Sequence, residues 1–188
     1  MTSPCLTITS GVRLGAVLTV AVFSLLGTFV IGGHAQTEPP IDPWGQYRFL
    51  LGDWVSGPDS NGIEGGTNFS LDLDGKVLIR KNFANYPATK GKLAINHKDL
   101  MVLHLNGAAP AEADYWDNEG HTIHYMVRFN STSDTLQFTS NIINGAPRFR
   151  LSYTIQGFDS LKVIFEAAPP GSPDSFSPYV SGIIHRKQ

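Results

Sequence analysis

The feature that most limits the fold of this chain is an alternation of apolar and polar side chains with a period of two residues. In the segment 148–155, for example, the odd positions are all apolar and the even positions are all polar. Successive side chains of a β-strand point to opposite faces, so this period is typical of half-buried strands. The same region has no long segment with a helical period, which excludes the helical crossovers of a parallel sheet. The sequence therefore predicts an all-β, antiparallel fold.

Turn signals divide the alternating region into strands joined by short connections. The predicted strands cover residues 68–73, 76–85, 100–105, 111–116, 122–129, 135–142, 148–155, 161–167 and 179–186. Asp74-Gly75 predicts a two-residue hairpin turn, since both central positions of that turn favour a positive φ. Short connections between neighbouring strands favour a single meander barrel of about 8–10 strands over a two-sheet sandwich, because closure removes exposed edges.

The N-terminal 35 residues are predicted to be an export signal. Arg13 leads into the uncharged run 14–33, and the small residues Gly33 and Ala35 mark a cleavage site after Ala35. An uncleaved membrane anchor is the alternative, because a run of this length can cross a bilayer. Residues 36–43 are rich in proline and are predicted to be an extended linker, which leaves 44–188 as one domain. The expected location is extracytoplasmic, either periplasmic or secreted.

Charge and cysteine content exclude several classes of protein. The chain has 14 basic and 16 acidic side chains with no block of like charge, so we expect no nucleic-acid partner and no stable membrane insertion after signal removal. The single cysteine, Cys5, lies in the predicted signal, so the mature domain has no disulfide and no thiol nucleophile. His121 and His124 are three residues apart on a predicted strand and face opposite sides, so no metal site is predicted.

A short helix is predicted before the first strand. Asp42 provides an N-cap, Pro43 suits the first helical position, and the helix is expected to end at Gly52 after about two turns. On an α-helix Trp44, Tyr47 and Leu51 would share one face.

Gly52-Asp53-Trp54 follows this helix and resembles the Gly-x-Trp signature with which lipocalins and the wider calycin barrels begin. In those families a basic residue late in the chain packs across the tryptophan and closes one end of the barrel. The resemblance implies this structural role for Gly52, Trp54 and Arg186. Residues 49–54 and 115–121 also resemble small exported bacterial calycin-like proteins of unassigned activity, and the overall similarity covers most of residues 44–188.

The haem-binding, nitrobindin-like barrels also begin with Gly-x-Trp, and they use a late histidine as the iron ligand. The resemblance makes His185 the candidate ligand here, although residues 55–58 match the glycine-rich continuation of those proteins only loosely. Haem is therefore an alternative, while the lead hypothesis has no cofactor.

Side chains in the predicted inward rows are candidates for ligand contact. Aromatic residues there either line a cavity or fill the interior. Arg80 or Lys81 could turn inward to hold an acidic group of a ligand, or could reach the barrel mouth instead. His104 is either a satisfied core histidine or a ligand contact. The candidate ligand-binding residues are Arg80, Phe83, His104, Tyr125, Phe129, Phe138, Tyr153 and Phe165.

Three functions are consistent with these patterns. The lead hypothesis is a non-enzymatic exported barrel that holds a small apolar or amphipathic molecule. The second is a small hydrolase or isomerase that pairs His104 or His121 with Asp114 or Asp117, although the chain has no Gly-x-Ser-x-Gly or Ser-x-x-Lys nucleophile motif. The third is a filled barrel that acts through contact with other proteins.

Overall fold

The computed structural model describes residues 42–188, apart from residues 58, 60 and 108–110. The predicted export signal and most of the predicted linker lie outside the described residues. In chain order the elements are η1 (Gly45–Leu50), β1 (Gly52–Ser56), β2 (Glu64–Asp72), β3 (Val77–Tyr86), β4 (Ile95–His104), β5 (Glu112–Asp117), β6 (Thr122–Phe129), β7 (Thr135–Ser140), β8 (Arg148–Gly157), β9 (Ser160–Ala168) and β10 (Ser177–Arg186). Within the described part of the chain, no helix is both long and apolar enough to cross a membrane.

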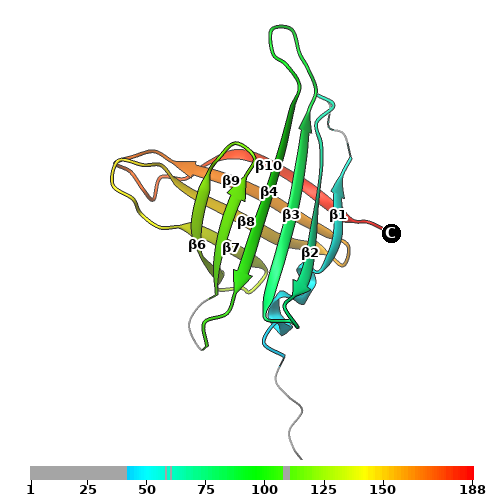
Figure 1. The fold of residues 1–188 in the computed structure, drawn as a ribbon, viewed down its shortest axis with the longest axis vertical. Coiled ribbons are helices and arrows are strands. Elements are labelled where there is room, and N and C mark those ends of the chain that lie inside the picture. Colours follow the sequence, from blue (N-terminus) through cyan, green and yellow to red (C-terminus); the bar gives the residue numbers. More distant parts are fainter. Residues whose placement is uncertain (1–41, 58, 60, 108–110) are drawn as a thin grey trace, which may run out of the picture. The chain divides into compact units, whose positions relative to one another are not determined.

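The ten strands form one closed antiparallel barrel (Figure 1). Each strand pairs with its neighbour in sequence, and the pairing of β1 with β10 closes the circle. The predicted all-β meander barrel is therefore confirmed. The seam is short, with Trp54 opposite Arg186 and Val55 opposite His185, so closure gives only the C-terminal end of β10 a partner on β1.

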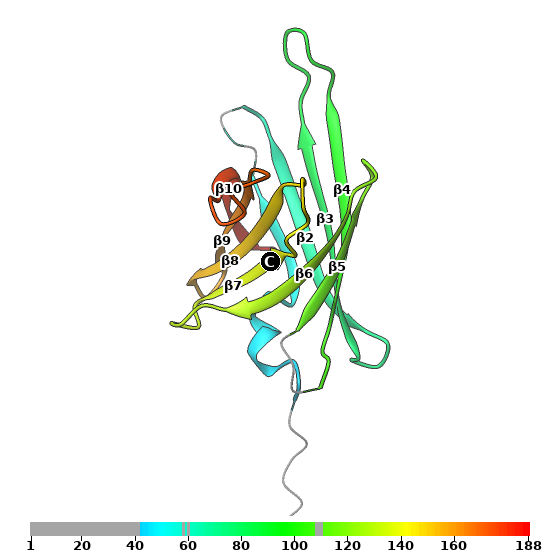
Figure 2. The same cartoon turned by 90° about the vertical axis from the view of Figure 1, so that its left-hand side faces the viewer.

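Strand β4 is longer than the sequence predicts, and the hairpin that it forms with β3 projects beyond the neighbouring strands (Figure 2). β4 begins at Ile95 rather than near residue 100. Residues 96–98 are polar, so the period-two pattern does not identify them as part of a strand. These residues nevertheless pair with β3 in regular register. The last pair of the β3–β4 ladder is Tyr86 with Ile95.

The hairpin between β2 and β3 differs from the predicted two-residue turn. Four residues, 73–76, connect the strands, and Leu73, Asp74 and Gly75 all have a positive φ. The amide of Lys76 donates to the carbonyl of Asp72 at 3.1 Å. Leu73 continues the apolar alternation of β2, which is why the sequence pattern places it in the strand.

The N-terminal helix is a 3-10 helix, Gly45–Leu50, rather than an α-helix. A 3-10 helix has three residues per turn, so the side chains at intervals of three share one face. Trp44, Tyr47 and Leu50 are accordingly buried, and Leu51, predicted for that face, is only half-buried. Asp42 keeps a capping function, because its Oδ1 accepts a hydrogen bond from the amide of Trp44 at 3.0 Å.

Helix η1 covers one end of the barrel, which we call the lower end; the opposite end, toward the β3–β4 hairpin, is the mouth (Figure 1). At the lower end the Arg186 guanidinium lies 4.3 Å from the centre of the Trp54 ring. Its two Nη atoms donate to the carbonyls of Leu51 and Phe49 at 2.5 and 3.2 Å. Gly52 has φ +112°, and a Cβ there would lie 2.9 Å from Arg186 Nη1, so this position requires glycine.

Candidate functional site

Aromatic side chains fill the middle of the barrel. Phe69, Tyr153, Phe138, Tyr125 and Tyr115 form a continuous series of edge-to-face contacts, with ring centroids 5.5 to 6.3 Å apart. These rings come from five strands and, apart from the half-buried Tyr115, are almost completely buried. The layer is packed, so a ligand inside the barrel has to lie between it and the mouth.

A buried ion pair lies against this aromatic layer. Arg80 on β3 donates from Nη1 to Oδ1 of Asp99 on β4 at 2.5 Å, and Asn82 Nδ2 donates to the other carboxylate oxygen at 2.7 Å. The Arg80 and Asp99 side chains are only 7% and 3% exposed. Of the two basic residues considered for an inward position, Arg80 is buried and Lys81 is exposed on the outer face.

Two polar atoms beside this ion pair have no hydrogen-bond partner among the described residues. They are Nε of Arg80 and Oη of Tyr153. Both residues belong to inward-facing rows, whereas the third such atom, Oγ of Ser152, belongs to the opposite row of β8. Burial raises the pKa of Tyr153 more than the nearby Arg80 guanidinium lowers it, so its hydroxyl stays protonated and, like Arg80 Nε–H, is a donor. Each unpaired buried donor costs about 1–3 kcal/mol.

The interior between this layer and the mouth is accessible to solvent. Val180 and Gly182 face inward on β10, as their pairing with Phe165 and Val163 shows, yet Val180 is 47% exposed. A Cβ added at Gly182 would meet no atom within 4 Å. Phe149 and Phe165 stack on each other with centroids 5.6 Å apart and planes 13° apart, and both are half-buried. The inward face of β10 at Val180 and Gly182 is thus open, and it lies beside an aromatic wall.

His97 is an interior residue that the sequence analysis did not select. Its Nδ1 lies 2.8 Å from Oε1 of Glu119, and its Nε2 lies 3.3 Å from both Oδ2 of Asp99 and Oη of Tyr115. Burial raises the pKa of Tyr115, so this phenol is protonated. The signal that could have identified His97 is its even spacing from Asp99 and Met101, which places all three in one row of β4.

The turn between β5 and β6 brings a second histidine–carboxylate pair to the mouth. Asp117 Oδ2 lies 2.8 Å from Nδ1 of His121, and Asp117 Oδ1 accepts from the amides of Glu119 and His121. Burial alone would raise the pKa of Asp117, but the hydrogen bonds from His121 and Glu119 hold it below its ordinary value. This is the turn chemistry expected of the Asp117–Gly120 sequence.

Phe83 and His104 lie on the outer surface, which corrects the expectation that they line the interior. Phe83 is 40% exposed, and its ring lies against Gly66, where a Cβ would meet it at 2.7 Å. His104 Nε2 lies 3.7 Å from Oδ2 of Asp114, whose Oδ1 is 2.9 Å from Nδ1 of His124. These residues alternate with the buried ones on their strands, so they face outward. No group of three or more His, Cys, Asp or Glu residues in the described chain is arranged to hold a metal ion.

Phe129 also lies apart from the candidate site, although its row faces inward. Its ring contacts Tyr47 and Phe49 of η1, with centroids 5.7 and 6.1 Å away. It is therefore part of the packing at the lower end of the barrel. Phe165, by contrast, lies in the solvent-accessible upper interior.

His185 does not fit the role of a haem ligand inside the barrel. It is exposed on β10 and pairs with Val55 and Ser160, while its neighbours Ile184 and Arg186 face inward. Consecutive residues of a strand point to opposite faces, so the His185 ring points away from the interior. The haem alternative depends on His185, and the outward position of this residue does not support it.

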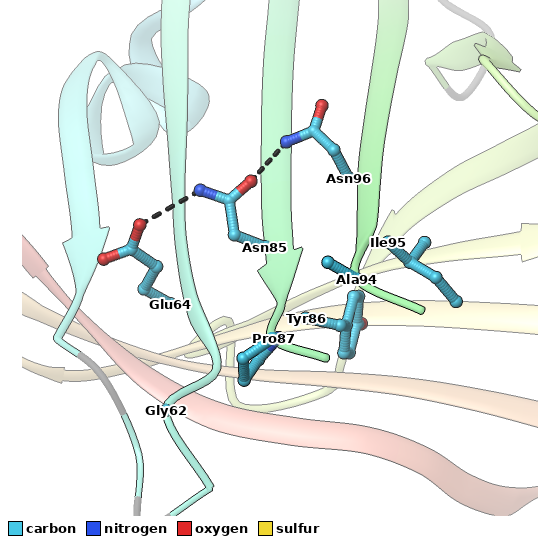
Figure 3. Close-up of a pocket in the computed structure, with 8 residues that line it drawn as sticks. All are labelled: Gly62, Glu64, Asn85, Tyr86, Pro87, Ala94, Ile95 and Asn96. Atoms are coloured by element: carbon cyan, nitrogen blue, oxygen red, sulfur yellow. Dashed lines mark hydrogen bonds between the residues drawn. The ribbon is translucent and has the colours of Figure 1, made fainter. Parts of the chain in front are cut away.

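A pocket of about 370 Å³ lies at the base of the projecting hairpin (Figure 3). It is lined by Gly62, Glu64, Asn85, Tyr86, Pro87, Ala94, Ile95 and Asn96. Asn85 donates to Glu64 at 3.0 Å and accepts from Asn96, so the polar side chains of this pocket satisfy one another. None of the candidate residues lies there, and we place the candidate site in the barrel interior, where the unpaired donors are.

Removing the Tyr153 hydroxyl is expected to stabilise the protein. In Tyr153→Phe the buried unpaired donor is lost while the ring contacts remain, so the free energy of unfolding should rise by about 1 kcal/mol. Tyr115→Phe is the matched control: it loses hydrogen bonds to Asp117 and His97 and should be destabilised by about the same amount. Urea denaturation of both variants measures this, and equal losses would show that the Tyr153 hydroxyl is paired.

Comparison with known proteins supports the fold. No family model matches the sequence, and no curated protein matches it either. Among solved structures the chain is similar to Rv2717c from M. tuberculosis, with 16% identity and a TM-score of 0.56 over 77% of this chain and 97% of that chain. At this identity the similarity concerns the fold alone. The chain is thus an antiparallel, closed β-barrel that fits a calycin-like class and is compatible with ligand binding.

Proposed function

We propose that this protein is an exported, calycin-like barrel that binds a small amphipathic molecule in the upper half of its interior. The observation that carries the proposal is the combination of two unpaired buried donors with the solvent-accessible, aromatic-walled space toward the mouth. Ligand sites in proteins typically have this composition, with mostly apolar walls and a few polar groups that fix orientation. Phe149 and Phe165 would contact the apolar part of the ligand, and Arg80 and Tyr153 would contact its polar end.

The test fills the interior from β10, where glycine leaves room. In Gly182→Phe the new ring would occupy the free space, whereas Ser181→Phe places the same ring on the outer face of the same strand. Uptake is measured by native mass spectrometry after incubation with a cell lipid extract, and affinity by displacement of a fluorescent apolar dye. We expect Gly182→Phe to weaken binding by at least about tenfold and Ser181→Phe to leave it unchanged.

Two results would contradict the proposal. Equal binding by Gly182→Phe and the unsubstituted protein would place the ligand outside the barrel. No uptake of any fatty acid, isoprenoid or other lipid by the unsubstituted protein would instead favour the hypothesis of a barrel that acts through protein contact.

An acid–base enzyme is a second candidate function, and the position of His97 favours it. This histidine lies in an inward-facing row, and the Glu119 carboxylate 2.8 Å from its Nδ1 would orient the ring so that Nε2 could accept a proton as a general base. The pair His104 and Asp114 is on the convex outer face and is not part of a concave site. Ester hydrolysis by the unsubstituted protein that is lost in His97→Asn, but not in His104→Asn, would support the enzyme over the binding protein.

A further inference from the structure

The charged groups around Arg80 indicate which kind of polar group a ligand in the barrel interior would carry. This inference rests on the proposed ligand-binding function and concerns the same site. The Arg80 guanidinium is compensated inside the protein by the carboxylate of Asp99, at 2.5 Å. Asp99 in turn accepts from Asn82 and has His97 3.3 Å away, so its own carboxylate is held in place. The arginine therefore has no uncompensated positive charge to offer a ligand.

Further acidic groups lie on the mouth side of this pair. Asp117 is bound by His121, and Glu119 is bound by His97. A ligand carboxylate at Arg80 would bring a second negative charge to a guanidinium that already has one. Charges in a buried environment are poorly screened, so this repulsion is stronger than it would be in water.

What the interior offers is hydrogen-bond donors. Nε–H of Arg80 and O–H of Tyr153 are both buried, both face inward, and both lack an acceptor among the described residues. The Tyr153 ring packs edge-to-face on Phe69, the residue paired with Arg80, which places the two side chains in one part of the interior. A carbonyl oxygen has two lone pairs and could accept from both donors.

We propose that the ligand presents an uncharged oxygen acceptor to Arg80 and Tyr153, as in a ketone, ester or quinone, and that Asp99 is the residue that discriminates against a carboxylate. A site built to hydrogen-bond one group rejects analogues that leave its buried polar atoms unpaired or its charges unbalanced. Asp99 acts here through Arg80 and is a positioning residue.

The experiment compares three ligands of equal chain length, a methyl ketone, a carboxylic acid and an alkane, by dye displacement at neutral pH. We expect the unsubstituted protein to bind the ketone about tenfold or more tightly than the ionised acid. Lowering the pH through the pKa of the acid should strengthen binding of the acid alone, because the protonated acid is uncharged. Tyr153→Phe should weaken binding of the ketone and leave binding of the alkane unchanged.

Asp99→Asn should reduce or reverse the preference for the ketone, with folding checked by circular dichroism; if this variant does not fold, the ligand series on the unsubstituted protein decides. Equal or tighter binding of the ionised acid by the unsubstituted protein would overturn the inference while leaving the binding function intact. Failure of all three ligands to bind would instead count against the proposed function itself.

Discussion

Substitution of Asp99 by alanine is expected to lower the free energy of unfolding by about 3–5 kcal/mol, because it leaves the buried Arg80 guanidinium without a counter-charge. The Asp99 side chain is only 3% exposed and accepts hydrogen bonds from both Arg80 and Asn82. Urea denaturation followed by tryptophan fluorescence measures the change.

Asp114→Ala is the matched control for this substitution. Asp114 is also a strand carboxylate near a histidine, but it lies on the outer face and is 40% exposed. Exposed ion pairs typically contribute at most about 1 kcal/mol, so the control should change stability only slightly. Equal effects of the two substitutions would mean that the Arg80–Asp99 pair is solvated and that the interior is more polar than the structure indicates.

Substitution of Trp54 by alanine is the second change with a large expected effect, a loss of about 3–5 kcal/mol. Trp54 is 1% exposed, its Nε1 donates to the carbonyl of Leu50 at 2.7 Å, and its ring lies under the Arg186 guanidinium. Removing the indole would leave a cavity between η1 and the strands and would also remove the cation–π contact at the lower end.

Trp116→Ala provides the comparison for Trp54→Ala. Trp116 is also on a strand, but it is on the outer face and 42% exposed, so its removal creates no enclosed cavity. The same chemical denaturation series should show a loss several times smaller than for Trp54. Similar losses for both tryptophans would contradict the assignment of Trp54 as the residue that seals the lower end.

The sequence predicts the barrel well because a period of two is a strong signal wherever one face of a strand is buried. It fails where that condition is absent. Residues 96–99 of β4 are polar on both faces, so the period-two pattern identifies only the second half of this strand, which starts five residues before the predicted position. The N-terminal helix was placed correctly, but a pattern of three apolar residues does not separate an α-helix from a 3-10 helix.

The candidate site depends on strand register, which the sequence does not specify. Arg80 was among the inward candidates, yet its partner Asp99 is nineteen residues away and on the next strand, opposite Asn82. Both rows of β3 contain apolar and basic residues, so the sequence does not identify the buried row; the even positions face inward, and Phe83 lies in the outward row. When both faces of a strand contain apolar and polar side chains, the pattern does not show which face is buried. The pairing with the neighbouring strands determines the buried face.

The seam between β1 and β10 makes formation of the barrel dependent on the two ends of the domain. The register there includes only Trp54 with Arg186 and Val55 with His185. A nascent chain that lacks β10 has two unsatisfied edges and a tryptophan without its covering arginine, so the wall cannot close until the C-terminal strand is available. Contacts between residues so distant in sequence form slowly, since the entropy of a long loop opposes them. We therefore expect truncation before Ser177, which removes β10, to yield a chain that aggregates through its open strands instead of a smaller stable barrel.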